Sequence, residues 1–162
     1  MQLTHPDTNI PPEMELSRFT DYSLRALIFV AVRGEESCSV KDIAEAFGLS
    51  RNHMVKIVHN LAKLGYLETR RGRGGGLRLQ QPADELRIGD VVQQTESLSL
   101  VECFRPEKGQ CCIAGVCELE SVLRSATKSF VEELNRHTLA DITHRKTALR
   151  RRLGLTSRPA GK

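Results

Sequence analysis

Residues 39–79, "SVKDIAEAFGLSRNHMVKIVHNLAKLGYLETRRGRGGGLRL", decide the fold of this chain. Apolar residues at helical spacing predict one helix over about 40–47 that stops at Gly48, and a second over about 51–63 with Ser50 as its N-cap. A three-residue joint containing glycine connects them. Two short helices joined in this way form a helix-turn-helix, although any packed pair of helices would give the same pattern.

The residues that follow the second helix predict a β-hairpin. Two short alternating stretches, about 66–71 and 77–81, flank a glycine-rich turn. The glycines do not form a nucleotide loop, because Leu77 stands at the last position of G-x-G-x-x-G and no G-K-[ST] is present. A helix-turn-helix followed by a hairpin is a winged helix. The expected fold class is therefore mostly α with a small β-hairpin wing.

The polar residues of these two elements point to double-stranded DNA. The N-terminal part of a recognition helix meets base edges, and arginines in a wing suit phosphates or a minor groove. Each residue alone could be a solvated surface position, but the cluster occupies two elements that meet the same ligand. The candidate DNA-binding residues are Ser50, Arg51, Asn52, His53 and Lys56 in the helix, and Arg70, Arg71, Arg73 and Arg78 in the wing.

Upstream, residues 1–13 contain three prolines and little apolar content, so we expect a disordered leader. The apolar spacing of residues 20–34 predicts a helix with Thr20 as its N-cap and Gly34 as its stop. A short helix near 88–96 follows the wing and packs back on the domain. The predicted DNA-binding domain therefore spans residues 14–97.

Downstream, residues 119–143 predict one long amphipathic helix. Its apolar stripe consists of Leu119, Leu123, Ala126, Phe130 and Leu134. A stripe of this length suits pairing with a second copy, and a symmetric homodimer predicts a palindromic DNA site. The alternative is a helix packed on its own domain. Residues 144–162 carry seven Lys or Arg, and we expect a basic disordered tail.

Composition limits the class of protein. The chain has 162 residues, a formal net charge of +4 and a pI near 8.9. No apolar run approaches the roughly 18 residues needed to span a bilayer, and the N-terminus lacks the pattern of a secretory signal. We therefore expect a cytoplasmic protein with no membrane partner, in a compartment where thiols stay reduced. No catalytic constellation is present, which favours a non-enzymatic protein.

Residues 98–118 form a cysteine-rich loop that holds four of the five cysteines, Cys103, Cys111, Cys112 and Cys117. The ligand pairs of a structural zinc site are usually two to four residues apart, whereas the spacing here is C-x7-C-C-x4-C. A redox thiol pair does not account for four cysteines. An iron–sulfur cluster, held by thiolates in a flexible loop, fits best. Cys38 lies apart and reads as a small buried or loop residue.

The segments "MELSRFTDYSLRAL" (14–27), "CFRPEKGQCCIAGVCEL" (103–119) and "FVEELNRHTLADI" (130–142), with the winged helix between them, resemble the NsrR-type regulators. These are nitric-oxide-sensing repressors of a winged-helix family that also contains the IscR-type regulators of cluster biogenesis. The resemblance covers residues 14–143. It implies a dimeric repressor whose iron–sulfur cluster senses nitric oxide; nitrosylation would lower operator affinity and derepress nitric-oxide-response genes.

The resemblance also implies the cluster ligands. Cys103, Cys111 and Cys117 match the three family cysteines, and Cys112 is an extra thiol. IscR-like proteins have a histidine three residues after the last cysteine, where this chain has Glu120. NsrR-like proteins can use an aspartate of the partner protomer, here Asp21, although an acidic residue in a first helical turn is also stabilised by the helix dipole alone.

This ligand set suits a [4Fe–4S] cluster, and a [2Fe–2S] cluster remains open. Three alternatives also stay open at this stage. One is an iron- or cluster-status-responsive regulator of the same family, and another is a winged-helix regulator stabilised by zinc. The third is an electron-transfer or cluster-carrier protein, for which a four-arginine wing and a recognition helix would have no purpose.

Overall fold

The computed structural model describes residues 15–72, 75–104, 111–113 and 116–155. The first helix, α1 (Arg18–Arg33), begins at Ser17 and not at the predicted Thr20. The Ser17 hydroxyl caps the helix by accepting from the Thr20 amide at 3.3 Å, and the Ser17 amide donates to the Glu96 carboxylate at 2.6 Å. Thr20 is fully buried one turn later. Gly34 ends the helix with φ = 65°, as predicted.

The predicted helix-turn-helix is confirmed as α2 (Val40–Phe47) and α3 (Arg51–Lys63). Ser39 and Asp42 form a reciprocal capping box at the start of α2, and Gly48 ends it in the left-handed conformation. The core that α1, α2, α3 and the hairpin share contains several fully buried side chains: Leu27, Ile43, Met54 and Leu61. Burying a large aliphatic side chain of this kind stabilises the fold by about 1.5–3 kcal/mol.

The hairpin is confirmed as β1 (Leu67–Arg70) and β2 (Gly76–Leu79), paired antiparallel with Leu67 opposite Leu79. The loop before α2 supports it, because the Leu77 amide donates to the Cys38 carbonyl at 2.7 Å. A Cβ at position 76 would lie 2.6 Å from that carbonyl oxygen, so only glycine allows this approach. Cys38 is fully buried, as predicted, and burial raises the pKa of its thiol to about 12.

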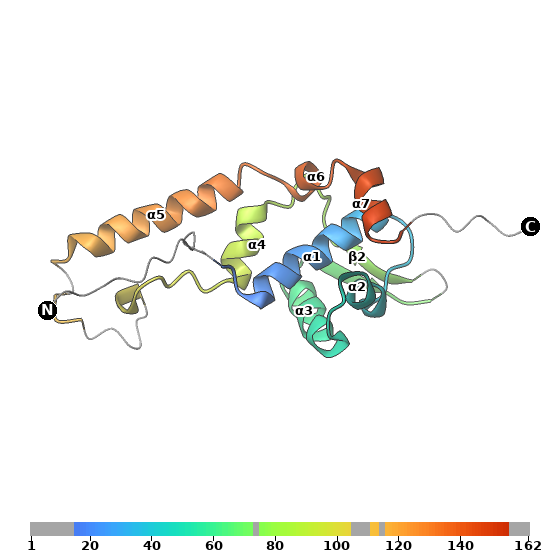
Figure 1. Ribbon diagram of the computed structural model, residues 1–162, viewed down its shortest axis with the longest axis horizontal. Coiled ribbons are helices and arrows are strands. Elements are labelled where there is room, and N and C mark those ends of the chain that lie inside the picture. The colour runs from blue at the N-terminus through green and yellow to red at the C-terminus, as the bar shows by residue number, and fades with distance from the viewer. Residues whose placement is uncertain (1–14, 73–74, 105–110, 114–115, 156–162) are drawn as a thin grey trace, which may run out of the picture.

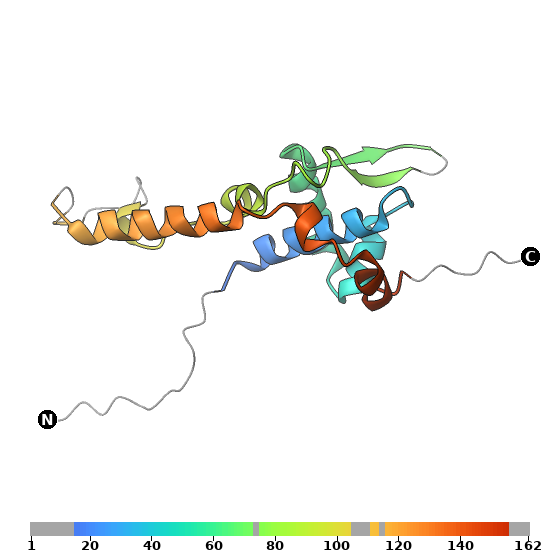
Figure 2. The same ribbon diagram turned by 90° about the horizontal axis from the view of Figure 1, so that it is seen from above.

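After the wing come α4 (Ile88–Thr95), the 3-10 turn η1 (Glu102–Phe104) and α5 (Glu118–Leu134). Figures 1 and 2 show α5 projecting from the helical body, with η1 near its far end. None of the α5 residues is buried. Phe130 and Leu134 pack against the edge of the core, whereas Leu119 and Val122 are 60% and 61% exposed. Within the predicted stripe, Phe130 and Leu134 are therefore packed and Leu119 is exposed, while Val122, which lies outside that stripe, adds a second exposed apolar side chain at the same end of α5.

The prediction of a single helix over 119–143 is wrong, because α5 stops at Leu134 and α6 (Leu139–Ile142) starts separately. Thr138 and Asp141 form a capping box that initiates α6. Thr138 also forms a β-bridge with Arg87, and the Leu139 amide donates to the Leu86 carbonyl at 2.8 Å. These contacts turn the chain back onto the body and bury Leu139 completely.

The prediction of a disordered tail over 144–162 is wrong for its first part, which forms α7 (Lys146–Arg152). Arg150 donates to the Val32 carbonyl at 3.1 Å and to the Glu36 carboxylate at 2.6 Å. Leu155 joins the hydrophobic core. The helical body therefore includes α6 and α7 and is not closed by residues 14–97. The predicted leader (1–13) and the last residues (156–162) lie outside the described residues.

Candidate nucleic-acid interface and metal centre

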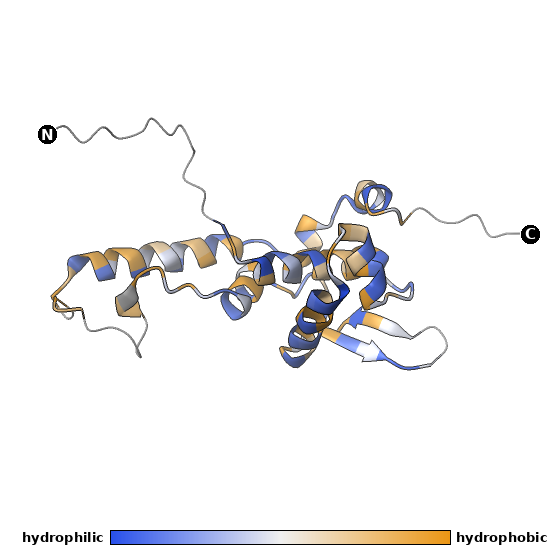
Figure 3. Ribbon diagram, turned by 60° about the horizontal axis from the view of Figure 1, so that its bottom comes forward, coloured by the Kyte–Doolittle hydropathy of each residue, from blue (hydrophilic) through white to orange (hydrophobic). Residues whose placement is uncertain are grey.

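The start of α3 presents the predicted recognition residues to solvent. Ser50, Arg51, Asn52, His53 and Lys56 are all exposed, while the opposite side of the helix enters the core. The Ser50 side chain makes no capping hydrogen bond within this described helix, so its hydroxyl is available to a ligand. Figure 3 shows that α3 is largely hydrophilic on its outer side. These residues offer hydrogen bonds for base edges and phosphates.

Sequence reasoning missed Val55, which is 48% exposed between the polar residues of α3. Its position outside the buried stripe of Met54, Ile57 and Val58 was the available signal. An exposed aliphatic side chain on a recognition helix suits contact with the methyl group of thymine.

The wing arginines divide into two kinds. Arg70 and Arg71 are exposed, and Arg70 pairs with the Glu68 carboxylate on the same strand at 2.6 Å. Arg78 is different, because its guanidinium binds Glu35 twice, through the carboxylate at 2.5 Å and the backbone carbonyl at 2.9 Å. Its side chain is only 17% exposed. Arg78 therefore anchors the wing to the loop after α1. Arg73 lies outside the described residues.

The cysteines that sequence reasoning singled out gather at one hollow of about 420 Å³ beside the start of α5. Cys103 belongs to η1 and Cys117 is the N-cap residue of α5, while Cys111 and Cys112 lie between these elements in sequence. The remaining lining residues are Val101, Ile113, Leu119, Glu120 and Leu123. Thiols in a mostly apolar recess are the environment in which a thiolate-bound iron–sulfur cluster is held.

The four cysteines bring thiol donors to one recess. Among the residues that the structure describes, no three His, Cys, Asp or Glu side chains come close enough to hold one metal ion. In a [4Fe–4S] cluster each protein ligand binds a different iron, so the ligands lie further apart than those of a tetrahedral zinc. Cysteine thiols are the donors that iron–sulfur clusters use, so the residue types at this recess fit such a group.

Asp21 does not line the cysteine hollow of its own chain. Its carboxylate is held by Arg25, one turn along α1, through contacts of 2.9 and 2.8 Å. The Arg25 guanidinium also lies over the rings of Tyr22 and Phe47, at 5.7 and 5.8 Å. Sequence reasoning missed this arginine, although its i, i+4 spacing from Asp21 is the usual signal for an ion pair.

A hydrogen-bonded joint connects the helical body to the arm formed by η1 and α5, which carry Cys103 and Cys117. The Asn135 side chain accepts from the Asp90 amide and donates to the Asp90 carboxylate, both at 2.9 Å. The Asn135 carbonyl accepts from Arg87 at 3.2 Å. Gly89 permits this approach, because a Cβ there would lie 2.5 Å from the Val131 carbonyl oxygen. The joint fixes the position of the C-terminal end of α5 relative to the start of α4.

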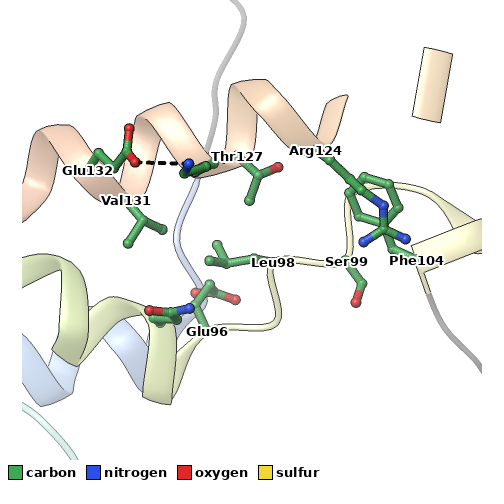
Figure 4. Close-up of a pocket in the computed structure, with 10 residues that line it drawn as sticks. Glu96, Leu98, Ser99, Phe104, Arg124, Thr127, Val131 and Glu132 are labelled. Atoms are coloured by element: carbon green, nitrogen blue, oxygen red, sulfur yellow. Dashed lines mark ion pairs between the residues drawn. The ribbon is translucent and has the colours of Figure 1, made fainter. Parts of the chain in front are cut away.

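A groove between α4 and α5 is lined by Val131, one turn before Asn135, and by Phe104, the residue after Cys103; Figure 4 shows its lining side chains. Glu96 lines it, and burial tends to raise the pKa of its carboxyl. Hydrogen bonds from the Ser17 amide and from the Thr20 and Ser17 hydroxyls outweigh burial and lower that pKa below its ordinary value. At the other end of the groove, Arg124 lies over the ring of Phe104.

Comparison with known proteins places this geometry in a family. Residues 16–145 match the family model Rrf2, described as an iron-dependent transcriptional regulator. The chain belongs to the Rrf2 family. It is 46% identical over 139 residues to the HTH-type transcriptional regulator NsrR of Geobacillus kaustophilus, covering 85% of this chain and 95% of that protein. It is 44% identical over 135 residues to the NsrR of Bacillus subtilis, covering 82% and 92%.

Solved structures agree with this assignment. IscR of T. potens aligns with a TM-score of 0.67 and 28% identity, covering 81% of this chain and 87% of that one. CymR, the global cysteine regulator of B. subtilis, aligns with a TM-score of 0.63 and 27% identity, covering 82% and 98%. The winged-helix prediction is therefore confirmed. This Rrf2 protein is a DNA-binding transcriptional regulator and not an enzyme, since its relatives are named regulators.

Proposed function

We propose that this Rrf2 regulator is a cytoplasmic, homodimeric repressor that binds a palindromic operator and responds to nitric oxide through an iron–sulfur cluster. The observation that carries the proposal is the gathering of Cys103, Cys111, Cys112 and Cys117 at one recess on the arm that leaves the winged helix. Among the described residues, no helix is long and apolar enough to cross a membrane.

The DNA contacts would come from α3 and the wing. Arg51 can donate two hydrogen bonds to guanine and Asn52 can pair with adenine, while Ser50, His53 and Lys56 suit phosphates or base edges. Arg70, Arg71 and Arg73 of the wing would neutralise phosphates. Each phosphate contact contributes about −0.9 to the slope of log affinity against log salt. Arg78 is left out of this set because its side chain is only 17% exposed and binds both the carboxylate and the carbonyl of Glu35, whereas Arg70, which pairs with Glu68, is 65% exposed.

The exposed half of α5 supports the homodimer. Leu119 and Val122 are more than half exposed in the single chain, on a helix whose residues are all incompletely buried. Two such helices packed together would remove apolar area from water and stabilise the pair by about 25 cal/mol per Å² before the cost of association. The twofold axis of that pair would set the spacing of the two recognition helices, and with it the operator half-sites.

The cluster would be held by Cys103, Cys111 and Cys117, with Asp21 of the partner protomer as the fourth ligand and Cys112 as an additional thiol. This ligand set favours [4Fe–4S], and [2Fe–2S] remains the alternative. When bound, the cluster supplies iron that a small molecule such as nitric oxide can attack. In the single chain both oxygens of Asp21 contact Arg25, so a bond to iron would compete with that ion pair or share the carboxylate with it. The bond from Asp21 across the dimer would then tie the two winged helices together.

The joint at Asn135 supports coupling between the recess and DNA. Because α5 is attached to α4 through Asp90 and Asn135, a change at the cysteine end of α5 would alter the position of the helical body relative to the partner protomer. Nitrosylation of the cluster would release the spacing of the recognition helices and lower operator affinity, which would derepress the target genes.

The test is an anaerobic titration of the purified dimer with nitric oxide, followed by visible absorbance and by binding to a palindromic promoter fragment. We expect a brown chromophore that bleaches over a few equivalents of nitric oxide per cluster while DNA affinity falls in step. DNA affinity that ignores nitric oxide and follows iron supply would instead establish an iron-status regulator. A colourless protein with one zinc per chain would establish a zinc-stabilised one.

A further inference from the structure

Arg124 makes two contacts that join α5 to η1. Its Nε and Nη2 atoms donate to Oε1 of Glu120 at 3.1 and 2.8 Å. Its guanidinium carbon lies 4.5 Å from the centre of the Phe104 ring, and Figure 4 shows the guanidinium over that ring. Guanidinium groups bind aromatic faces through both charge and stacking. Arg124 of α5 thus contacts Phe104, which lies 20 positions earlier in the sequence.

Both partners of Arg124 belong to the cysteine recess or border it. Glu120 lines the recess together with the cysteines, and Phe104 directly follows Cys103 in η1. Cys117, in contrast, is built into the start of α5 as its N-cap residue. Within the described residues, the position of Cys103 relative to Cys117 therefore depends on how η1 is held against α5.

We propose that Arg124 is a positioning residue for the cysteine site. By stacking on Phe104 while bound to Glu120, it holds η1 against α5 and keeps Cys103 at the recess that Cys117 lines. This inference deepens the proposed function, since the recess is the site to which the cluster is assigned. Arg124 itself ligates nothing, because a guanidinium has no acceptor atom.

The first test needs no metal. In the reduced, metal-free protein, iodoacetamide labelling followed by peptide mass spectrometry gives the alkylation rate of each cysteine. Arg124→Met should raise the rate at Cys103 about five-fold, the factor that corresponds to about 1 kcal/mol, and leave the rate at Cys117 unchanged. An unchanged rate at Cys103, or an equal rise at both cysteines, would overturn the proposal.

Lys128 provides a matched control. It lies one turn further along α5 in the same groove and pairs with Glu132 at 3.5 Å, with an even more exposed side chain. Lys128→Met should leave the Cys103 rate at its wild-type value, and circular dichroism should show the same thermal midpoint for both variants. If Lys128→Met acts on Cys103 as strongly as Arg124→Met, the effect is one of charge in general, and the proposal fails.

A second substitution tests the stacking directly. Phe104→Leu removes the ring but leaves the ion pair between Arg124 and Glu120, and it should raise the Cys103 rate as Arg124→Met does. Because both act on one contact, the double variant should be no faster than either single variant. Arg124→Lys keeps the charge without the planar fork and should give an intermediate rate. A double variant whose effects multiply, or a lysine variant as fast as Arg124→Met, contradicts the proposal.

The final experiment measures how much iron–sulfur cluster the variants retain. After anaerobic reconstitution, iron and sulfide are measured per chain, and Arg124→Met should retain less of both than Lys128→Met. If the wild-type chain binds no cluster while Arg124→Met still exposes Cys103, the proposed function fails and the positioning role stands. If the wild-type chain binds a cluster and Arg124→Met retains it equally, with Cys103 unchanged, the positioning role fails alone.

Discussion

Gly89→Ala tests the joint between α4 and α5 with a single added methyl group. A Cβ at this position would lie 2.4 Å from Oδ1 of Asn135 and 2.5 Å from the carbonyl oxygen of Val131. The first obstacle is a side chain that can turn away, but the second belongs to the backbone of α5. The substitution therefore forces α5 to move away from α4, whatever Asn135 does.

The sign of the effect on stability follows from two opposing terms. Replacing glycine by alanine within a helix gains at most about 1 kcal/mol of helix propensity. Overpacking a close contact costs about 1–3 kcal/mol, and a backbone carbonyl leaves little room for relief. We expect Gly89→Ala to lower the free energy of unfolding by about 1 kcal/mol net, although propensity alone predicts a gain.

The assay is urea unfolding followed by circular dichroism, with the slope of the transition checked for constancy. Asn135→Ala is the reference background, because it removes the Oδ1 obstacle and leaves the Val131 carbonyl in place. Gly89→Ala should remain destabilising in that background, by less than in the wild type. A Gly89→Ala protein as stable as the wild type, or more stable, would refute the close approach of the two helices.

Three further outcomes are expected. Arg51→Ala should weaken operator binding by about 1–3 kcal/mol and relax specificity at one base pair, whereas Arg71→Ala should weaken all sequences and reduce the salt slope by about 1, both measured by fluorescence anisotropy at several salt concentrations. Alkylation of the native protein at pH 8 should spare Cys38. Because the pKa of its thiol is raised from 9.0 to about 12, its contribution to stability is complete below pH 9 and is lost as the pH rises toward about 12. A Cys38→Ser variant should lack this alkaline loss of stability and serves as the comparison. The lowered pKa of Glu96 stabilises the fold at pH values above its ordinary value of 4.5, and this contribution is lost as the pH falls through the lowered pKa. The wild type should therefore be more stable than Glu96→Gln above pH 4.5, and acid-unfolding curves should show this difference disappear as the pH falls.

Local signals were sufficient for the helix-turn-helix. The bounds of α2 and α3 follow from Gly48 and from apolar spacing, which act within one or two turns of the chain. The arginine-bearing hairpin follows from its alternation and glycine turn in the same way. The cluster of cysteines was visible in the sequence because its four members lie within 15 positions.

Contacts between distant residues decided the rest, because no window of sequence contains both partners. Glu96 moved the start of α1 to Ser17 from 79 residues away, Asp90 fixed the end of α5 through Asn135 across 45 residues, and Arg150 tied α7 to Val32 across 118. The sequence grouped Arg78 with the other wing arginines, and only the fold shows that Glu35, 43 residues away, binds its guanidinium. The sequence by itself determined the helix-turn-helix, the wing and the chemical groups that this regulator carries, but not the separate helices α6 and α7. Tertiary structure decided where helices end and which charges remain available, since both depend on packing and hydrogen bonding between elements that only folding brings together.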